Sequence, residues 1–158
     1  MEEIKMRKNF GAKPYTYPQP VYIVAAYDED GTPDAMNAAW GGISDDTQIS
    51  MCLSPGHKTV KNKFEKAGFH AVKSEFVDAP LIEELPMAVE CRLVSYDAQS
   101  CRMVGEIVNV SADESVLGEN GKIDPAKLDP IVFDPVNMAY LKLGEKVGNA
   151  FKDGLALK

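Results

Sequence analysis

The stretch from Pro20 to Asn62 constrains the fold most, because it holds strand-length apolar runs separated by turn-forming residues. Val21 to Tyr27 is a bounded apolar run of strand length, which favours a buried strand over a helix. Asp28-Glu29-Asp30-Gly31 has the composition of a tight turn, with glycine where positive φ is needed. The chain returns through Thr32 to Trp40, and we expect Gly41-Gly42 to end this second strand. The pattern predicts an antiparallel hairpin.

A third strand and a helix are predicted in the rest of this stretch. Gln48 to Ser54 alternates, with Ile49, Met51 and Leu53 on one face, which is typical of a strand with one buried face. The segment Ser54-Pro55-Gly56-His57-Lys58-Thr59 then leads into a helix, whose apolar face is formed by Val60, Phe64 and Ala67. Gly68 is the expected C-cap of that helix.

The remainder of the chain also contains more strand signals than helix signals. Asp124 followed by Pro125 predicts the start of a short helix. An irregular apolar stripe from Asn137 to Phe151, weakened by Gly144 and Gly148, predicts a second helix. The expected strands are Ala71 to Glu75, Ala88 to Tyr96 and Cys101 to Ala112, with a proline-bounded connection from Ala79 to Pro86. Without regular βαβ alternation, the order favours an antiparallel barrel or an α+β layout over a doubly wound sheet.

Composition bounds the partners and the compartment. A length of 158 residues fits a single domain over residues 1–158. The formal net charge of −7 argues against nucleic acid or an anionic membrane as a general partner. We find neither an apolar run long enough to span a membrane nor a signal peptide. Three cysteines, Cys52, Cys91 and Cys101, without CxxC spacing predict reduced thiols in a cytoplasmic protein, and we expect Cys52 to be buried.

Several motifs together resemble the flavin reductase-like family, specifically its flavoredoxin-type branch. The resemblance rests on Ala35-Met36-Asn37-Ala38-Ala39-Trp40-Gly41-Gly42 and on the following His57-Lys58-Thr59. The segments Ala79 to Glu84, Gly105 to Val108 and Leu143 to Gly148 look like the same family. The resemblance implies a mainly β fold, namely an FMN-binding split β-barrel of Greek-key type with a few helices. It also implies a homodimer, which apolar residues on both faces of the Ala88 to Tyr96 strand favour as well.

Two groups of residues are the predicted cofactor site. Ser54, His57, Lys58 and Thr59, with Asn62 nearby, offer the cation, hydroxyl groups and backbone N–H groups that an FMN phosphate needs; the alternative is an exposed helix cap. The second group offers small residues, an amide and an indole for the isoalloxazine ring. It consists of Met36, Asn37, Ala38, Ala39 and Trp40. Trp40 either stacks on the ring or closes one end of the barrel.

The function implied by the resemblance is redox chemistry with FMN, in which a nicotinamide, NADH or NADPH, reduces the flavin as co-substrate. An FMN-containing electron carrier fed by another protein is the alternative, and a cofactor-free interaction barrel is a third possibility. Because the cofactor carries the chemistry, we predict no catalytic side chain. His57, His70 and the cysteines lack zinc-ligand spacing, so we predict no metal site, and Glu83-Glu84 is interpreted as an ordinary solvated pair.

One departure from the family concerns the chain after Asn62. The family usually carries a few tens more residues before the segment that resembles Lys63 to Phe69, and these supply another strand. We therefore expect missing residues, with the Cα atoms of Asn62 and Lys63 farther apart than the roughly 3.8 Å of a bonded pair.

Overall fold

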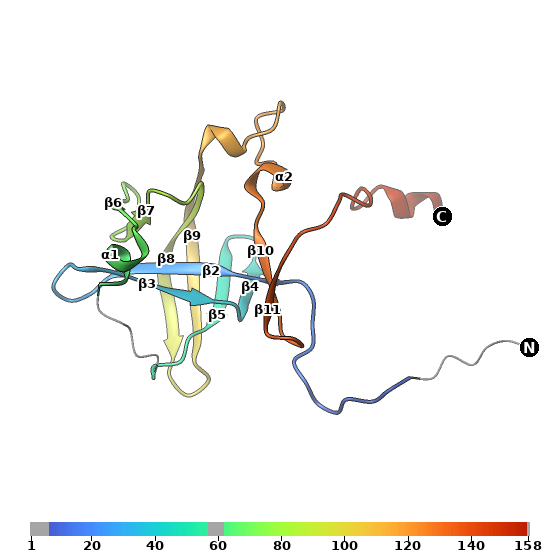
Figure 1. Ribbon diagram of the computed structural model, residues 1–158, viewed down its shortest axis with the longest axis horizontal. Helices are drawn as coiled ribbons and strands as arrows, with labels where there is room; N and C mark the ends of the chain where they lie inside the picture. Colours follow the sequence, from blue (N-terminus) through green and yellow to red (C-terminus); the bar gives the residue numbers. More distant parts are fainter. Residues whose placement is uncertain (1–6, 57–61, 158) are drawn as a thin grey trace, which may run out of the picture.

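Antiparallel strands form most of the molecule (Figure 1). The computed structural model describes residues 7–56 and 62–157. Its largest sheet has the strand order β4-β5-β9-β8. These strands are β4 (Gly41–Asp45), β5 (Gln48–Cys52), β8 (Met87–Asp97) and β9 (Arg102–Ala112). The long β8–β9 hairpin and the pairing of β5 with β9 build one wall of the barrel, which agrees with the predicted mainly β fold.

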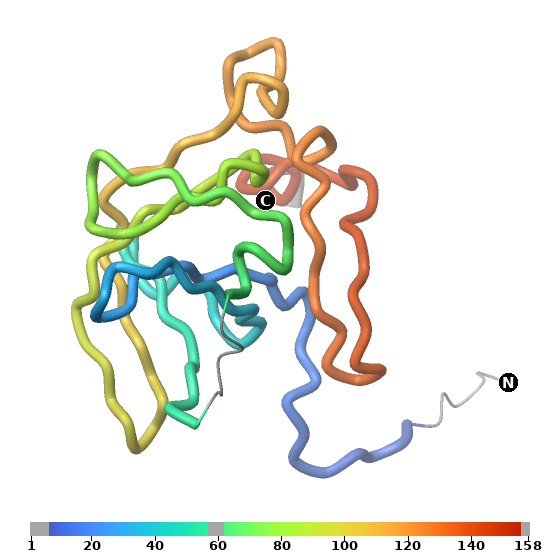
Figure 2. The backbone as a smooth tube through the Cα atoms, turned by 60° about the vertical axis from the view of Figure 1, so that its left-hand side comes forward, coloured from blue at the N-terminus to red at the C-terminus, as the bar shows by residue number. Residues whose placement is uncertain are grey.

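A second hairpin crosses this wall and is covered by a short helix on its other side. It consists of β2 (Tyr22–Tyr27) and β3 (Pro33–Ala38), joined by a turn in which Gly31 has a φ of 84°. Figure 2 shows this hairpin beside α1 (Lys63–Ala67) and the small β6–β7 sheet. The strands of that sheet are β6 (Ala71–Lys73) and β7 (Pro80–Ile82). Gly68 caps α1 in the left-handed conformation, as the sequence predicts.

The β2–β3 hairpin separates two apolar clusters. On one side, Ala35 packs with Phe64 and Ile82, and with the partly buried Ala25, Phe69 and Leu85. On the other side, Ala38 packs with Ile49 and Met51. Partly buried residues that surround this second cluster include Tyr22, Val24, Met103 and Ile107. Because Ala35 and Ala38 lie an odd number of residues apart on one strand, their side chains point to opposite faces.

The third sheet pairs a strand from the first part of the chain with two strands from its last part. Its order is β1-β10-β11, formed by β1 (Gln19–Pro20), β10 (Ile131–Asp134) and β11 (Ala139–Lys142). The buried Asp134 carboxylate accepts hydrogen bonds from the Tyr17 hydroxyl and from the backbone N–H groups of Val136 and Asn137. Donation by Tyr17 and Asn137 lowers the pKa of Asp134 to about 2. The N-terminal segment is thereby held against β10.

The remaining elements are short. A 3₁₀ turn (Glu114–Val116) precedes α2 (Pro125–Leu128), where Asp124 accepts the Ala126 N–H at 2.9 Å as the predicted N-cap. A second 3₁₀ segment (Asp153–Leu157) lies near the C-terminus, and both terminal segments project away from the body (Figure 1). Within the described ranges, no helix combines the length and the apolar character needed to cross a bilayer.

Three sequence predictions about the elements are wrong. Gly41 does not end β3 but begins β4, because its lack of a side chain lets β4 approach β5 closely. The connection from Ala79 to Pro86 contains strand β7. The stripe from Asn137 to Phe151 forms β11 and an irregular segment instead of a helix, since β10 offers a strand edge with which it pairs. Val60, part of the predicted helix face, lies outside the described residues.

The expected break after Asn62 is also wrong. Asn62 is the residue that precedes α1, and its carbonyl accepts the Lys66 N–H at 3.0 Å, so Asn62 and Lys63 are consecutive residues of one helical turn. Asn62 itself takes a left-handed conformation with a φ of 62°. The chain therefore passes directly from Asn62 into α1.

Gly41 and Gly42 give a matched test of the β4–β5 contact. A Cβ atom at Gly41 would lie 2.7 Å from the Met51 Cβ and 2.9 Å from the Ser50 carbonyl oxygen, whereas at Gly42 it would meet nothing within 4 Å. We expect Gly41→Ala to lower the free energy of unfolding by about 1–3 kcal/mol, the usual cost of overpacking. Gly42→Ala should change it by less than about 0.5 kcal/mol. Urea unfolding measures both, and equal effects would contradict the close approach.

Candidate functional site

A shallow pocket lies between the β2–β3 hairpin and α1. Ile23 pairs with Asn37 and Ala25 with Ala35, and these residues share the hairpin face that looks toward α1. The pocket has a volume of about 130 Å³ and is open to solvent. Its lining consists of Ile23, Ala35, Met36, Asn37, Lys63, Ala67 and Phe69. Two residues of the predicted cofactor site, Met36 and Asn37, therefore line a concave surface.

Lys63 is the cation of this pocket, and sequence reasoning missed it. Its Nζ donates a hydrogen bond to the Ala35 carbonyl oxygen at 2.5 Å and lies 3.4 Å from the Asp34 carboxylate. Its side chain is only 26% exposed, so these contacts hold the ammonium group at the edge of β3. Lys63 lies almost thirty residues after Asp34. No local pattern could have indicated the pair, because it forms only when α1 packs on β3.

A second group of predicted site residues lies where β3 leads into β4. Trp40 is 57% exposed, and its carbonyl oxygen accepts the Cys52 N–H at 2.8 Å. Ser54, two residues after Cys52, is exposed, and its hydroxyl oxygen accepts the Gly56 N–H at 3.3 Å. The indole therefore does not close the barrel end but offers a flat apolar surface beside the end of β5. Cys52, predicted to be buried, is exposed because it lies on the outer face of β5.

The other predicted residues have different environments. Ala38 is buried in the cluster with Ile49 and Met51, so its side chain is not available to a ligand, while Ala39 is half-buried. Asn37 and Asn62 are exposed. His57, Lys58 and Thr59 lie outside the described residues. The predicted set thus divides into a pocket-facing part, an exposed part around Trp40 and one residue of the core.

The two surfaces, the pocket and the exposed Trp40, carry residue types that a flavin can contact. A flavin needs a flat apolar wall and nearby backbone or amide groups, which Trp40 and Asn37 supply. The pocket volume of about 130 Å³ is well below the roughly 300–1,000 Å³ of ordinary ligand pockets. The pocket alone is therefore too small to enclose a whole FMN molecule.

Comparison with known proteins places this architecture among flavin-related split barrels. The fold matches the FMN-binding domain of a flavin reductase-like enzyme from Shewanella baltica OS155, with a TM-score of 0.67, 16% identity, and 84% of this chain and 88% of that chain covered. The flavoredoxin of Desulfovibrio vulgaris (Miyazaki F) matches with a TM-score of 0.88 and 31% identity. That match covers 94% of this chain and 100% of the flavoredoxin. The chain belongs to the flavin reductase-like family, in its flavoredoxin-type branch.

Sequence comparison adds a more distant relative. An uncharacterized protein of Bacillus subtilis (strain 168), YdfE, is 28% identical over 97 residues, which are 58% of this chain. The match covers 46% of YdfE, so the chain spans less than half the length of that relative. No family model matches the chain.

Proposed function

We propose that this chain binds FMN and takes part in redox chemistry, with NADH or NADPH as the reductant. The observation that carries the proposal is the 31% identity with a flavoredoxin over the whole length of that protein. The exposed indole of Trp40 beside the end of β5 supports it, because a flavin ring requires a flat apolar wall. The bound flavin would accept hydride, while the protein contributes binding and orientation.

The ring and the phosphate of FMN would contact different residues. Trp40, Asn37 and the backbone of Ala39 are the accessible groups for the isoalloxazine ring, and Ser54 lies beside the end of the same strand pair. We assign the phosphate to Lys58 and Thr59, with His57 and Asn62 as neighbours in sequence. The three free cysteines of the structure support a reducing compartment, the cytoplasm, as the location.

The phosphate assignment predicts a selective loss of affinity. Charge-assisted hydrogen bonds contribute roughly 1.5–3 kcal/mol each, so Lys58→Ala with Thr59→Ala should weaken FMN binding by about two to four decades. Riboflavin, which lacks the phosphate, should bind both proteins nearly equally. Trp40 is the one tryptophan of the chain, so quenching of its fluorescence during the titration reports binding at that residue. Unchanged FMN affinity in the folded double variant would move the phosphate elsewhere.

A second candidate function is an FMN-containing electron carrier without its own nicotinamide activity, because the matched protein is itself a flavoredoxin. Steady-state oxidation of NADH or NADPH by the purified protein with FMN distinguishes the two. We expect the protein to show the absorbance spectrum of bound flavin, and to oxidise NADH or NADPH only when FMN is present. A flavin spectrum without oxidation would favour the carrier. A colourless protein that takes up no FMN would favour a cofactor-free interaction barrel.

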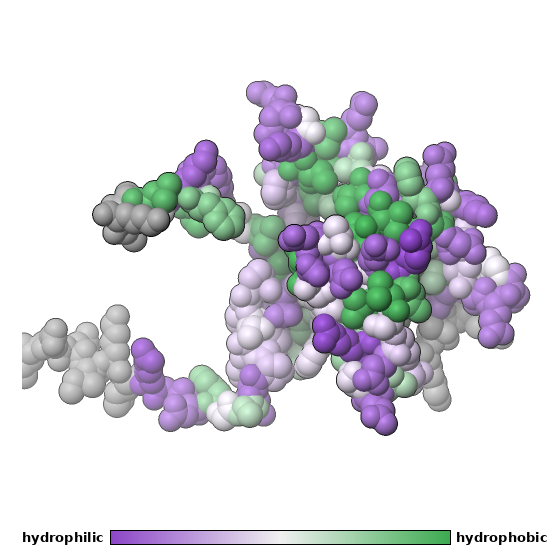
Figure 3. Space-filling view, turned by 180° about the vertical axis from the view of Figure 1, so that it is seen from behind, coloured by the Kyte–Doolittle hydropathy of each residue, from purple (hydrophilic) through white to green (hydrophobic). Residues whose placement is uncertain are grey.

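We further propose that the chain is a homodimer and that the second copy covers the open side of the site. Many apolar residues of β8 and β9 are exposed, and Figure 3 shows apolar side chains gathered on one face of the body. The exposed residues of these strands include Val89, Leu93, Val94, Val108 and Val110. A surface of this kind on a small protein is typical of an interface, and twofold symmetry is the commonest way to bury it.

Sedimentation velocity tests the dimer. We expect the wild type to sediment as a dimer at micromolar concentration and Leu93→Asp to shift the population toward monomer, since Leu93 is 62% exposed in one chain. Asp78→Asn, a change at an exposed position on the β6–β7 loop, serves as the control. A wild type that remains monomeric would contradict the proposal.

A further inference from the structure

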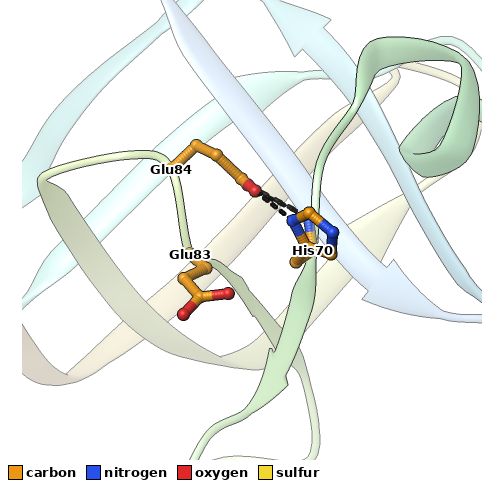
Figure 4. A group of neighbouring side chains, drawn as sticks. All are labelled: His70, Glu83 and Glu84. Carbon is orange, nitrogen blue, oxygen red and sulfur yellow. Dashed lines mark hydrogen bonds and ion pairs between the residues drawn. The ribbon is translucent and has the colours of Figure 1, made fainter.

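Three metal-ligating side chains meet at the open end of the β6–β7 hairpin, and none of them lines the pocket. His70 precedes β6, and Glu83 and Glu84 follow β7 (Figure 4). The register pairs Ala71 with Ile82, and the Glu83 N–H donates to the His70 carbonyl oxygen at 3.0 Å. The two strand ends are therefore fixed opposite each other. Pairing of the strands brings these residues together. The sequence therefore shows no zinc-ligand spacing that would have indicated them.

The Glu84 carboxylate is held in place by His70. The backbone N–H of His70 donates to both carboxylate oxygens, at 3.0 and 3.2 Å, and the ring Nδ1 lies 2.5 Å from Oε1. These three contacts hold the Glu84 carboxylate opposite the start of β6. Binding of an ion by both side chains would release the proton that His70 and Glu84 share in this contact, because a ligating ring nitrogen must be deprotonated.

Glu83 supplies the third ligand and remains available to bind. Its carboxylate accepts no hydrogen bond and forms no ion pair with the residues that the structure describes. Ligand atoms from His70, Glu83 and Glu84 all lie within 4.8 Å of one another. Two ligands of one zinc ion are at most about 4.2 Å apart, given bonds of about 2.1 Å. Small rotations of these exposed side chains close that difference.

We propose that His70, Glu83 and Glu84 bind a divalent first-row transition metal ion, with Zn²⁺ as the reference ion. One imidazole and two carboxylates suit this class better than Ca²⁺ or Mg²⁺, which take oxygen ligands. The cluster carries two negative charges beside one imidazole, and no lysine or arginine among the described residues forms an ion pair with either glutamate. A bound ion would neutralise these charges and tie the start of β6 to the end of β7, while water fills the remaining coordination positions.

Calorimetric titration of the full chain with ZnCl₂ at neutral pH tests the site. We expect one binding site, with affinity reduced at least about 10-fold by His70→Ala and by Glu83→Gln. Glu83→Gln is the sharper variant, because it removes one ligand and leaves the His70–Glu84 contact intact. Asp45→Asn, a change at an exposed carboxylate on β4, is the matched control and should have no effect.

Two further measurements separate this site from its alternatives. Free thiols bind zinc, so Cys52→Ser and Cys101→Ser should leave the affinity unchanged. Saturating Zn²⁺ should raise the melting temperature of the wild type more than that of Glu83→Gln, because the ion binds only the folded hairpin. Absence of binding, binding that survives both His70→Ala and Glu83→Gln, or binding lost in the cysteine variants would each overturn the proposal.

Discussion

The fold depends on the β2–β3 hairpin, which is covered by apolar side chains on both of its faces. Ala35 and Ala38 point to opposite sides of one strand, into separate clusters that contain α1 and the main sheet respectively. Small side chains at these positions allow close packing on both sides, so the hairpin acts as the middle layer of the molecule. A larger residue at either alanine would displace one cluster. The alternation that built the hairpin therefore also determines where the two halves of the protein meet.

The sequence predicted correctly those elements that depend only on neighbouring residues. The alternation in β5, the glycine turn before β3, and Asp124 with Pro125 before α2 each act over a few residues, and the structure confirms all of them. The failures involve partners far away in sequence. The segment after Asn137 has a helix-like stripe, yet β10 supplies hydrogen-bonding groups that make it a strand. The sequence predicts a strand end at Gly41, because the role of this glycine, to let β4 approach β5, exists only in the folded sheet.

The candidate site was predictable to a similar extent. The motif from Met36 to Trp40 identified a stretch that is accessible at Asn37 and Trp40, but sequence proximity could not reveal that Ala38 turns into the core. Lys63, with its contacts to Asp34 and Ala35, was invisible because the pair forms across the packed helix. Glu83 and Glu84 are exposed, as the sequence predicts, but only strand pairing places them beside His70. The sequence indicated which residue types could form a site. Which of them lie close together could be seen only in the folded structure.

The hydrogen bond between Tyr17 and Asp134 has a consequence for the pH range of the fold. Asp134 has its pKa lowered from 3.8 to about 2, so its contribution to stability is complete above its unfolded value and is lost as the pH falls through about 2. Tyr17 has its pKa raised above 10.0, chiefly by the hydrogen bond to Asp134, so its contribution is present below that value and is lost in stronger base. The attachment of the N-terminal segment is thus bounded by an acid limit and an alkaline limit, and between them neither group changes its charge.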